Sequence, residues 1–185
     1  MSAAAPTPVA AADAPSAVLV TEKLGHPHIG DQAPDFELPD HDGKLVRLSS
    51  LHGSTVVLAL VSSWCPYSQA EQTHLPELAA EYLPRGVRFL AVVVADNEAG
   101  YAKYCSRVAL PFPVLRDRDD TVALGYAPEK AQPWFKSRNK VVVTSNVVID
   151  RHGVIRYFGL IDTANFDANF VQVRAALDKL LAATS

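Results

Sequence analysis

Two runs of apolar residues stand out in the first half of the chain. Val56 to Val61 is apolar at every position, and Val87 to Ala95 is interrupted only by Arg88. Unbroken apolar runs of this length are typical of strands buried on both faces, whereas a strand with one face in water alternates apolar and polar residues. We therefore expect both runs to form strands in the interior of a sheet.

Segments with helical spacing alternate with these strands. The residues after Pro66 predict a helix that bends at Pro76, where a ring without an N–H interrupts the helical hydrogen bonds, and that ends near Gly86. Glu98 to Val108 predicts a second helix. Phe166 to Leu181 predicts a closing amphipathic helix, because its apolar residues recur at helical intervals.

Shorter strands complete the pattern. They are Phe36–Leu38 and Leu45–Leu48 around a turn at 40–43, Phe112–Leu115, and a hairpin of Lys140–Ile149 and Val154–Phe158. Strands that alternate with helices, and that end in a hairpin and a helix, predict a three-layer α/β/α domain with a mixed central sheet.

The length and composition fit one folded unit. The chain has 185 residues, 49% of them hydrophobic, which is enough for a single domain with a core. We interpret residues 1–25 as a disordered tail rich in Ala and Pro, and residues 26–185 as the folded domain. The tail does not have the pattern of a secretory signal, and no apolar run approaches the roughly 20 residues of a membrane span. We expect a cytoplasmic protein.

Charge and cysteine content narrow the class of protein. The net charge is −3 without a run of like charges, which gives no reason to expect nucleic acid or an anionic membrane as a partner. The only cysteines are Cys65 and Cys105, so the chain is not a disulfide-stapled scaffold. An oligomer stays open at this point.

Cys65 is the candidate nucleophile. It lies where the strand Val56 to Val61 gives way to a helix, and Pro66 follows at the first helical turn, where a missing N–H costs little. A thiol at a helix N-terminus faces unpaired backbone N–H groups and the positive end of the helix dipole. Both favour the thiolate, which is the reactive form.

Three segments resemble the redoxin families of the thioredoxin-fold superfamily. Trp64 to Ser68 (WCPYS) resembles the active-site turn of thioredoxin-fold proteins, whose usual form is Trp-Cys-x-x-Cys. Gly30 to Leu38 resembles the redoxin opening G-x-x-A-P-x-F, and Val147 to Ile155 resembles the late hairpin of these families. They include the alkyl-hydroperoxide-reductase/thiol-specific-antioxidant group (peroxiredoxins) and the thioredoxin-like reductases of cytochrome maturation. The resemblance implies a thioredoxin-like α/β/α fold from Gly30 to Leu181.

The resemblance also shows where this chain departs from the reductases. Ser68 stands where they carry a second cysteine, so the usual disulfide within the turn cannot form. What remains is monothiol chemistry at Cys65: a mixed disulfide, a sulfenic acid, or a bridge to Cys105 as resolving thiol. Cys105 is otherwise a packed cysteine on a helix face. Ser68 has a hydroxyl that can donate a hydrogen bond to the Cys65 thiolate.

Further positions follow from the same resemblance. Ser62 matches the Thr or Ser that peroxiredoxins carry three residues before their peroxidatic cysteine. Thr144 falls where peroxiredoxins carry an arginine and where reductases carry a cis-proline, so this position departs from both patterns; Leu58 likewise stands where peroxiredoxins carry a proline. Glu71 lies six residues after Cys65, where the cytochrome-maturation reductases often carry glutamate, and is a candidate proton relay or an ordinary helix residue.

Two aromatic features border the predicted site. We expect Trp64 to pack beside the turn and shield one flank of the thiol. The segment Ala127 to Lys140 is longer than a simple connection needs, and with Trp134 and Phe135 it is a candidate rim of the site. No cluster of Cys and His with metal-ligand spacing accompanies Cys65, and we expect neither a metal nor another cofactor.

The sequence therefore predicts a thiol oxidoreductase that acts through Cys65. It favours peroxiredoxin-like, antioxidant reduction of a peroxide through a sulfenic acid, which an external thiol, thioredoxin-like or small, then reduces. The second interpretation is monothiol exchange with a disulfide substrate. The third is a binding or redox-sensing module on a redoxin fold that does not turn over.

Overall fold

The computed structural model describes residues 28–94, 96–127, 144–160 and 167–183. Predictions for the tail, for Trp134 and Phe135, for Lys140 to Val143 and for Phe166 lie outside these residues. The strands are β1 (Glu37–Pro39), β2 (Leu45–Arg47), β3 (Val56–Val61), β4 (Arg88–Val93), β5 (Val114–Arg116), β6 (Ser145–Ile149) and β7 (Ile155–Leu160). The helices are η2 (Leu48–Leu51), α1 (Pro66–Gln72), α2 (Leu75–Tyr82), η3 (Leu83–Arg85), α3 (Glu98–Arg107), α4 (Thr121–Tyr126) and α6 (Val171–Ala182).

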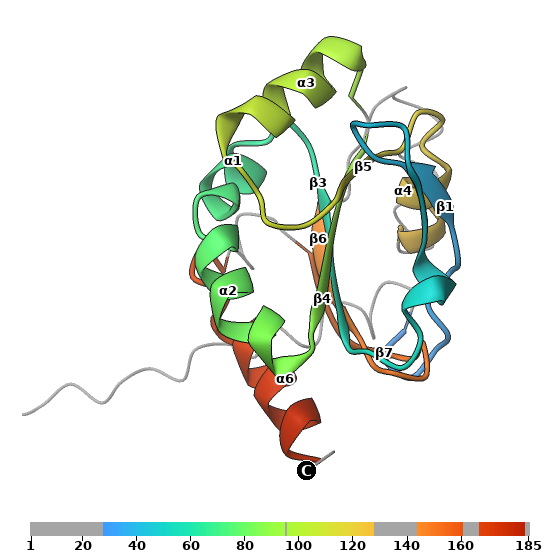
Figure 1. Ribbon diagram of the computed structural model, residues 1–185, viewed down its shortest axis with the longest axis vertical. Helices are drawn as coiled ribbons and strands as arrows, with labels where there is room; N and C mark the ends of the chain where they lie inside the picture. The colour runs from blue at the N-terminus through green and yellow to red at the C-terminus, as the bar shows by residue number, and fades with distance from the viewer. Residues whose placement is uncertain (1–27, 95, 128–143, 161–166, 184–185) are drawn as a thin grey trace, which may run out of the picture.

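The central sheet is mixed, as predicted. Its strand order is β5-β4-β3-β6-β7, with β3 parallel to β4, β4 parallel to β5, and β6 antiparallel to both neighbours. Helices α1, α2, α3 and α6 cover one face, while α4 and the pair β1–β2 cover the other (Figure 1). The three-layer α/β/α prediction is confirmed.

Alternation along β3 builds a core on each side of the sheet. Leu58 and Leu60 pack towards α4 with Tyr126, whereas Val57 packs towards α2 and α6 with Phe170. Every residue of β3 is buried, which explains why its sequence shows no polar alternation. Because β3 is packed on both faces, its end at Val61 holds the start of the following turn, which contains Cys65, in a fixed position.

The predicted single helix after Pro66 is wrong in one respect. Helix α1 ends at Gln72, and after a turn at Thr73 and His74 a second helix, α2, begins at Leu75 with Pro76 in its first turn. A proline inside a helix removes a hydrogen bond and its ring clashes with the carbonyl four residues earlier, whereas the first turn of a helix tolerates it. The prediction had the right residue but the wrong outcome, because Pro76 starts a helix instead of bending one.

Within the described residues, no helix is long and apolar enough to span a membrane.

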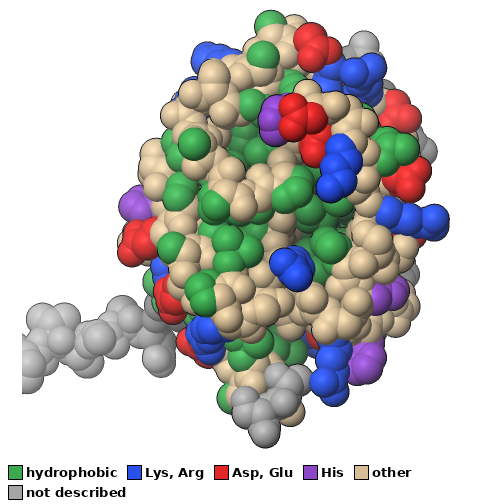
Figure 2. All heavy atoms as spheres, viewed as in Figure 1, with side chains coloured by type: hydrophobic (Ala, Val, Ile, Leu, Met, Phe, Trp, Pro, Cys, Tyr) green, Lys and Arg blue, Asp and Glu red, His purple; other side chains and the backbone are tan. Residues whose placement is uncertain are grey.

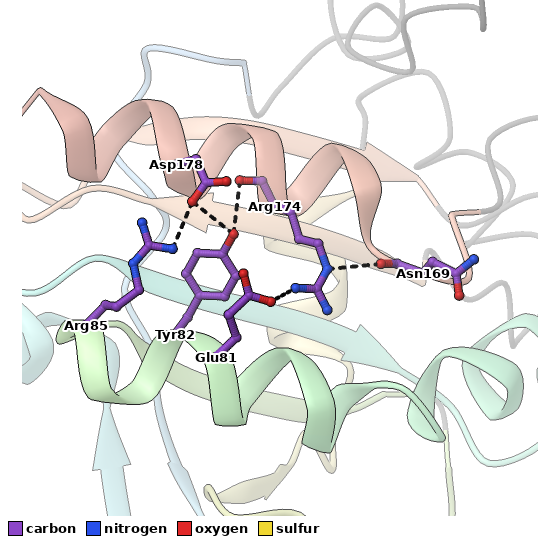
Figure 3. A network of polar contacts seen from close by, with 6 residues as sticks. All are labelled: Glu81, Tyr82, Arg85, Asn169, Arg174 and Asp178. Carbon is purple, nitrogen blue, oxygen red and sulfur yellow. Dashed lines mark hydrogen bonds and ion pairs between the residues drawn. The ribbon is translucent and has the colours of Figure 1, made fainter.

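A surface network ties α2 and η3 to α6 (Figure 3). The hydroxyl of Tyr82 donates to Asp178 Oδ1 at 3.0 Å, and Arg85 pairs with the same carboxylate at 2.9 Å. One helical turn away, Arg174 pairs with Glu81. The ring of Tyr82 is buried in the core, and the hydrogen bonds and ion pairs around its hydroxyl hold α6 against α2 at the outer side of the ring.

A groove of about 460 Å³ opens at the edge of the sheet, beside the start of β4. Hydrophobic and cationic side chains meet on this face of the molecule (Figure 2), and Phe112, Leu45 and Arg88 are among those that line the groove. Pro113 has no N–H to extend the ladder, so β5 pairs with only the second half of β4. The groove lies at the opposite end of the parallel strands from Cys65.

Candidate active site

Cys65 begins α1 directly after the strand β3. It is the N-cap residue, with φ −75° and ψ 119°, and its carbonyl accepts the helical hydrogen bond from the Gln69 N–H at 3.0 Å. Pro66 occupies the first turn, as predicted. Cys65 as a whole is 8% exposed, so it is buried in this structure.

The turn before Cys65 is held by a carboxylate from the neighbouring parallel strand. Asp96, just after β4, accepts from the Ser63 N–H at 2.6 Å and from the Ser63 hydroxyl at 2.7 Å. Gln69 donates to the Ser63 carbonyl at 2.6 Å. A Cβ on Gly100 would lie 2.2 Å from Asp96 Oδ1, so a side chain at residue 100 would displace this carboxylate. Sequence reasoning missed Asp96, although polar residues at the carboxyl ends of adjacent parallel strands meet at one edge of a sheet.

Thr144 is the residue whose side chain meets the sulfur. Cys65 Sγ and Thr144 Oγ1 are 3.9 Å apart, within hydrogen-bonding distance for sulfur. The antiparallel register of β3 and β6 pairs Leu60 with Ser145, which brings the start of β6 to the end of β3. The position that the resemblance assigned to a cis-proline thus lies beside the nucleophile and carries a hydroxyl.

Ser68 and Ser62 are both completely buried behind the turn. The hydroxyl of Ser68 accepts from the Ser62 N–H at 3.4 Å. This contact does not use the hydroxyl's own proton, so the donation to the Cys65 thiolate stays a prediction. Ser62 Oγ has no hydrogen-bond partner.

Glu71 lies on the buried side of α1, the helix that follows Cys65. Its Oε2 accepts from the Asn146 side-chain amide at 2.9 Å, and its Oε1 has no partner. Burial raises the pKa of Glu71 to about 8; the negative charge of Asp167 acts in the same direction, and the Asn146 hydrogen bond opposes both. Near neutral pH this carboxyl holds a proton that it can give up, which fits the predicted proton relay.

Neighbouring polar groups extend this buried cluster. Gln72 donates to the Tyr104 carbonyl at 2.7 Å and so joins α1 to α3. The Tyr104 hydroxyl, Gln72 Oε1 and Asn146 Oδ1 have no hydrogen-bond partner. Burial, with the nearby Glu71 charge, raises the pKa of Tyr104 far above its usual range, so its hydroxyl stays protonated. Unsatisfied buried polar atoms cost stability, and such clusters are found where function requires them.

Trp64, the residue before Cys65, is partly exposed. It is 51% exposed, which makes it one of the large hydrophobic side chains on the surface. About half of the residue's surface thus faces solvent. That Trp64 shields one flank of the thiol stays a prediction. An exposed aromatic next to a nucleophile offers a partner molecule an apolar contact.

Cys105 lies on α3, partly buried against the core under that helix. Burial raises the pKa of its thiol, and a hydrogen bond with Tyr101 opposes this. Both cysteines are free thiols in this structure. Pairing of Cys105 with Cys65 stays a prediction.

The family model for AhpC/TSA proteins matches residues 29–158, which is more than half of the chain. This chain belongs to the AhpC/TSA family. The predicted membership is thereby confirmed. The turn with Cys65 and the strands β3 and β6 fall within the matched residues, which end inside β7.

Curated relatives are thiol-disulfide oxidoreductases. The chain is 36% identical over 98 residues to the thiol-disulfide oxidoreductase ResA of Geobacillus thermodenitrificans, a match that covers 53% of this chain and 56% of the relative. The chain therefore spans little more than half the length of that relative. With ResA of Oceanobacillus iheyensis the identity is 35% over 131 residues, covering 66% of this chain and 68% of the relative.

Solved structures with a similar fold include both a thiol:disulfide interchange protein and a peroxidoxin. A Chlorobium tepidum protein assigned as a thiol:disulfide interchange protein DsbE is 25% identical, with a TM-score of 0.62 over 83% of this chain and 97% of its own. The peroxidoxin BcpB of Mycobacterium tuberculosis is 26% identical, with a TM-score of 0.58 over 83% and 94% of the two chains.

Proposed function

We propose that the protein is a monothiol thiol-disulfide oxidoreductase with Cys65 as its nucleophile. The observation that carries the proposal is the position of Cys65: it is the N-cap residue of α1, is 8% exposed as a residue, and its Sγ lies 3.9 Å from Thr144 Oγ1. The names of the curated relatives support a disulfide substrate over the peroxide that the sequence favoured.

The absence of a second thiol at residue 68 shapes the reaction. Cys65 attacks a disulfide, a new S–S bond forms to one substrate sulfur, and the other sulfur leaves as a thiolate that takes up a proton. Ser68 cannot resolve this mixed disulfide, so a thiol from outside the turn must do so. The partners are accordingly a disulfide substrate and an external thiol reductant.

Peroxide reduction is the second candidate. It is favoured by the buried, unpartnered hydroxyl of Ser62 and by the likeness to a peroxidoxin. The missing arginine counts against it: among the described residues, Arg116 is bound to Glu98, and no contact joins an arginine to Cys65. A non-catalytic module is the third candidate. The cytoplasmic location and the oligomeric state stay predictions.

The experiment mixes reduced protein with oxidised glutathione or with hydrogen peroxide, and follows both reactions by stopped-flow and intact mass. We expect a single glutathione adduct that forms faster than on free cysteine. The adduct should persist in Cys105→Ser and be absent in Cys65→Ser.

Other outcomes select the other candidates. Rapid oxidation by peroxide with slow reaction towards oxidised glutathione would replace the proposal with peroxide reduction. Reaction no faster than that of free cysteine with either reagent would leave a binding or sensing module. A loss of two hydrogens that needs both cysteines would assign Cys105 as the resolving thiol.

A further inference from the structure

The start of β6 meets the active-site helix at two points. Thr144 immediately precedes β6 and contacts Cys65 Sγ at 3.9 Å. Asn146 lies two residues further on and donates to Glu71 Oε2 at 2.9 Å. Residues i and i+2 of an extended chain share a face and lie about 7 Å apart. One short stretch of backbone therefore touches both the nucleophile and the buried acid.

The hydroxyl of Thr144 lies where it can donate a hydrogen bond to Cys65 Sγ, which the cap of α1 does not do. The cap of α1 has no hydrogen bond from a backbone N–H to the Cys65 side chain. The Ser68 hydroxyl is engaged with the Ser62 N–H. Among the described residues, the hydrogen-bonding contact recorded for Cys65 Sγ is the one with Thr144. A hydroxyl at this distance can donate to a thiolate and favours the charged form.

The contact of Asn146 fixes which oxygen of Glu71 holds the proton. The Asn146 amide donates to Oε2, so this oxygen acts as acceptor and Oε1 is left to carry the proton. The titratable groups that face Glu71 from neighbouring elements are Tyr104 of α3, Tyr157 of β7 and Asp167 ahead of α6. Burial raises the pKa of both tyrosines further above their ordinary value near 10. Both hydroxyls therefore stay protonated, and neither competes for the Glu71 proton.

We propose that Thr144 is a catalytic residue that donates its hydroxyl to the Cys65 thiolate, and that Asn146 is a positioning residue that orients the Glu71 carboxyl. The inference rests on the proposed function only in taking Cys65 as the nucleophile. When Cys65 forms the S–S bond with a substrate sulfur, its charge moves to the leaving sulfur, and Thr144 no longer has a thiolate to bind. Thr144 thus stabilises the reduced, reactive state of the site.

The first test measures the rate of iodoacetamide alkylation of Cys65 against pH, in a Cys105→Ser background so that one thiol reacts. Thr144→Val removes the hydroxyl and keeps the shape, and Thr144→Ser restores the hydroxyl. Because hydrogen bonds to charged groups are the stronger ones, we expect the Val variant to move the midpoint of the profile up by about one pH unit. Ser145→Ala is the matched control, since the Ser145 hydroxyl is buried and unpartnered.

The outcomes separate cleanly. A raised midpoint in Thr144→Val, with the parent midpoint in Thr144→Ser and Ser145→Ala, supports the role of Thr144. An unchanged midpoint in Thr144→Val overturns it, as does a Ser variant that behaves like Val. If the parent reacts with oxidised glutathione but the Val midpoint is unchanged, the proposed function stands and only this inference fails.

The second test follows the titration of Glu71 by carbon NMR, with Glu71→Gln to assign the signal. Asn146→Leu, or the smaller Asn146→Ser if Leu does not fold, removes the donor to Oε2. We expect the midpoint of the Glu71 signal to rise by about one pH unit, because a hydrogen bond to the charged carboxylate is lost. An unchanged midpoint in a folded variant would show that Asn146 does not position this carboxyl.

Discussion

Two polar clusters hold helices of the same layer, and they differ in how well their hydrogen bonds are satisfied. The network of Tyr82, Asp178 and Arg174 joins α2 to α6 at the surface through paired donors and acceptors (Figure 3). The cluster around Glu71 and Asn146 joins α1 to β6 in the interior, where each of these residues has one unpartnered oxygen.

The difference indicates that the surface network stabilises the fold and that the buried cluster takes part in proton transfer. Exposed ion pairs and a tyrosine hydrogen bond contribute modestly to stability and cost little in desolvation. A buried, unsatisfied carboxyl costs stability, and a fold retains it when its proton is used. We therefore expect substitutions in the surface network to change stability alone, and removal of the buried carboxyl by Glu71→Gln to raise stability at neutral pH while it impairs function.

Glu71→Gln gives the largest expected effect on stability. The pKa of Glu71 rises from 4.5 to about 8 on folding, so its contribution to stability is complete below pH 4.5 and is lost as the pH rises towards 8. The loss is about 1.4 kcal/mol per pH unit in this window, a few kcal/mol in all. Urea unfolding at pH 5, 6.5 and 8 should show that the Gln variant lacks this slope.

The control for this experiment is Glu77→Gln, an exposed glutamate in the first turn of α2. It should keep the slope of the parent protein. A Glu71→Gln variant with the same pH dependence as the parent would contradict the assignment of the buried cluster as a destabilising site.

Tyr82→Phe gives an intermediate effect in the surface network. The variant keeps the buried ring and loses the hydrogen bond to Asp178, and we expect a loss of about 1 kcal/mol in the free energy of unfolding. The Arg85 and Tyr82 bonds help to hold the pKa of Asp178 below 3.8, so their contribution is present above pH 3.8 and is lost as the pH falls further. Urea unfolding at pH 7 measures the loss, and reaction with oxidised glutathione should be unchanged.

Arg174→Gln gives the smallest effect. It breaks the ion pair with Glu81, whose side chain is 46% exposed, and an exposed pair contributes roughly 0.5 kcal/mol. Since salt screens exposed charges, the difference from the parent should shrink in 1 M sodium chloride, where the Debye length is about 3 Å. Thermal unfolding at low and high salt measures it, with Arg107→Gln on α3 as control. A loss of activity in this variant would break the division between the two clusters.

Local patterns predicted most of the fold. The apolar runs at β3 and β4 required buried neighbouring strands, and the sheet has them side by side. The strand-to-helix turn at Cys65 and the proline after it were also predictable, because they depend on residues adjacent in sequence. The break before α2 was not predicted, since a proline either bends a helix or begins one, and packing decides between these outcomes.

The sequence by itself determined the fold class, the candidate nucleophile and the lack of a second thiol at residue 68. Only the tertiary structure decided what surrounds the sulfur. Thr144 meets Cys65 and Asn146 meets Glu71 because β6 runs antiparallel to β3, and contacts between residues so far apart in the chain depend on strand order and register. Burial, which raises the pKa of Glu71, is likewise a property of the assembled layers, and no local pattern along the chain encodes it.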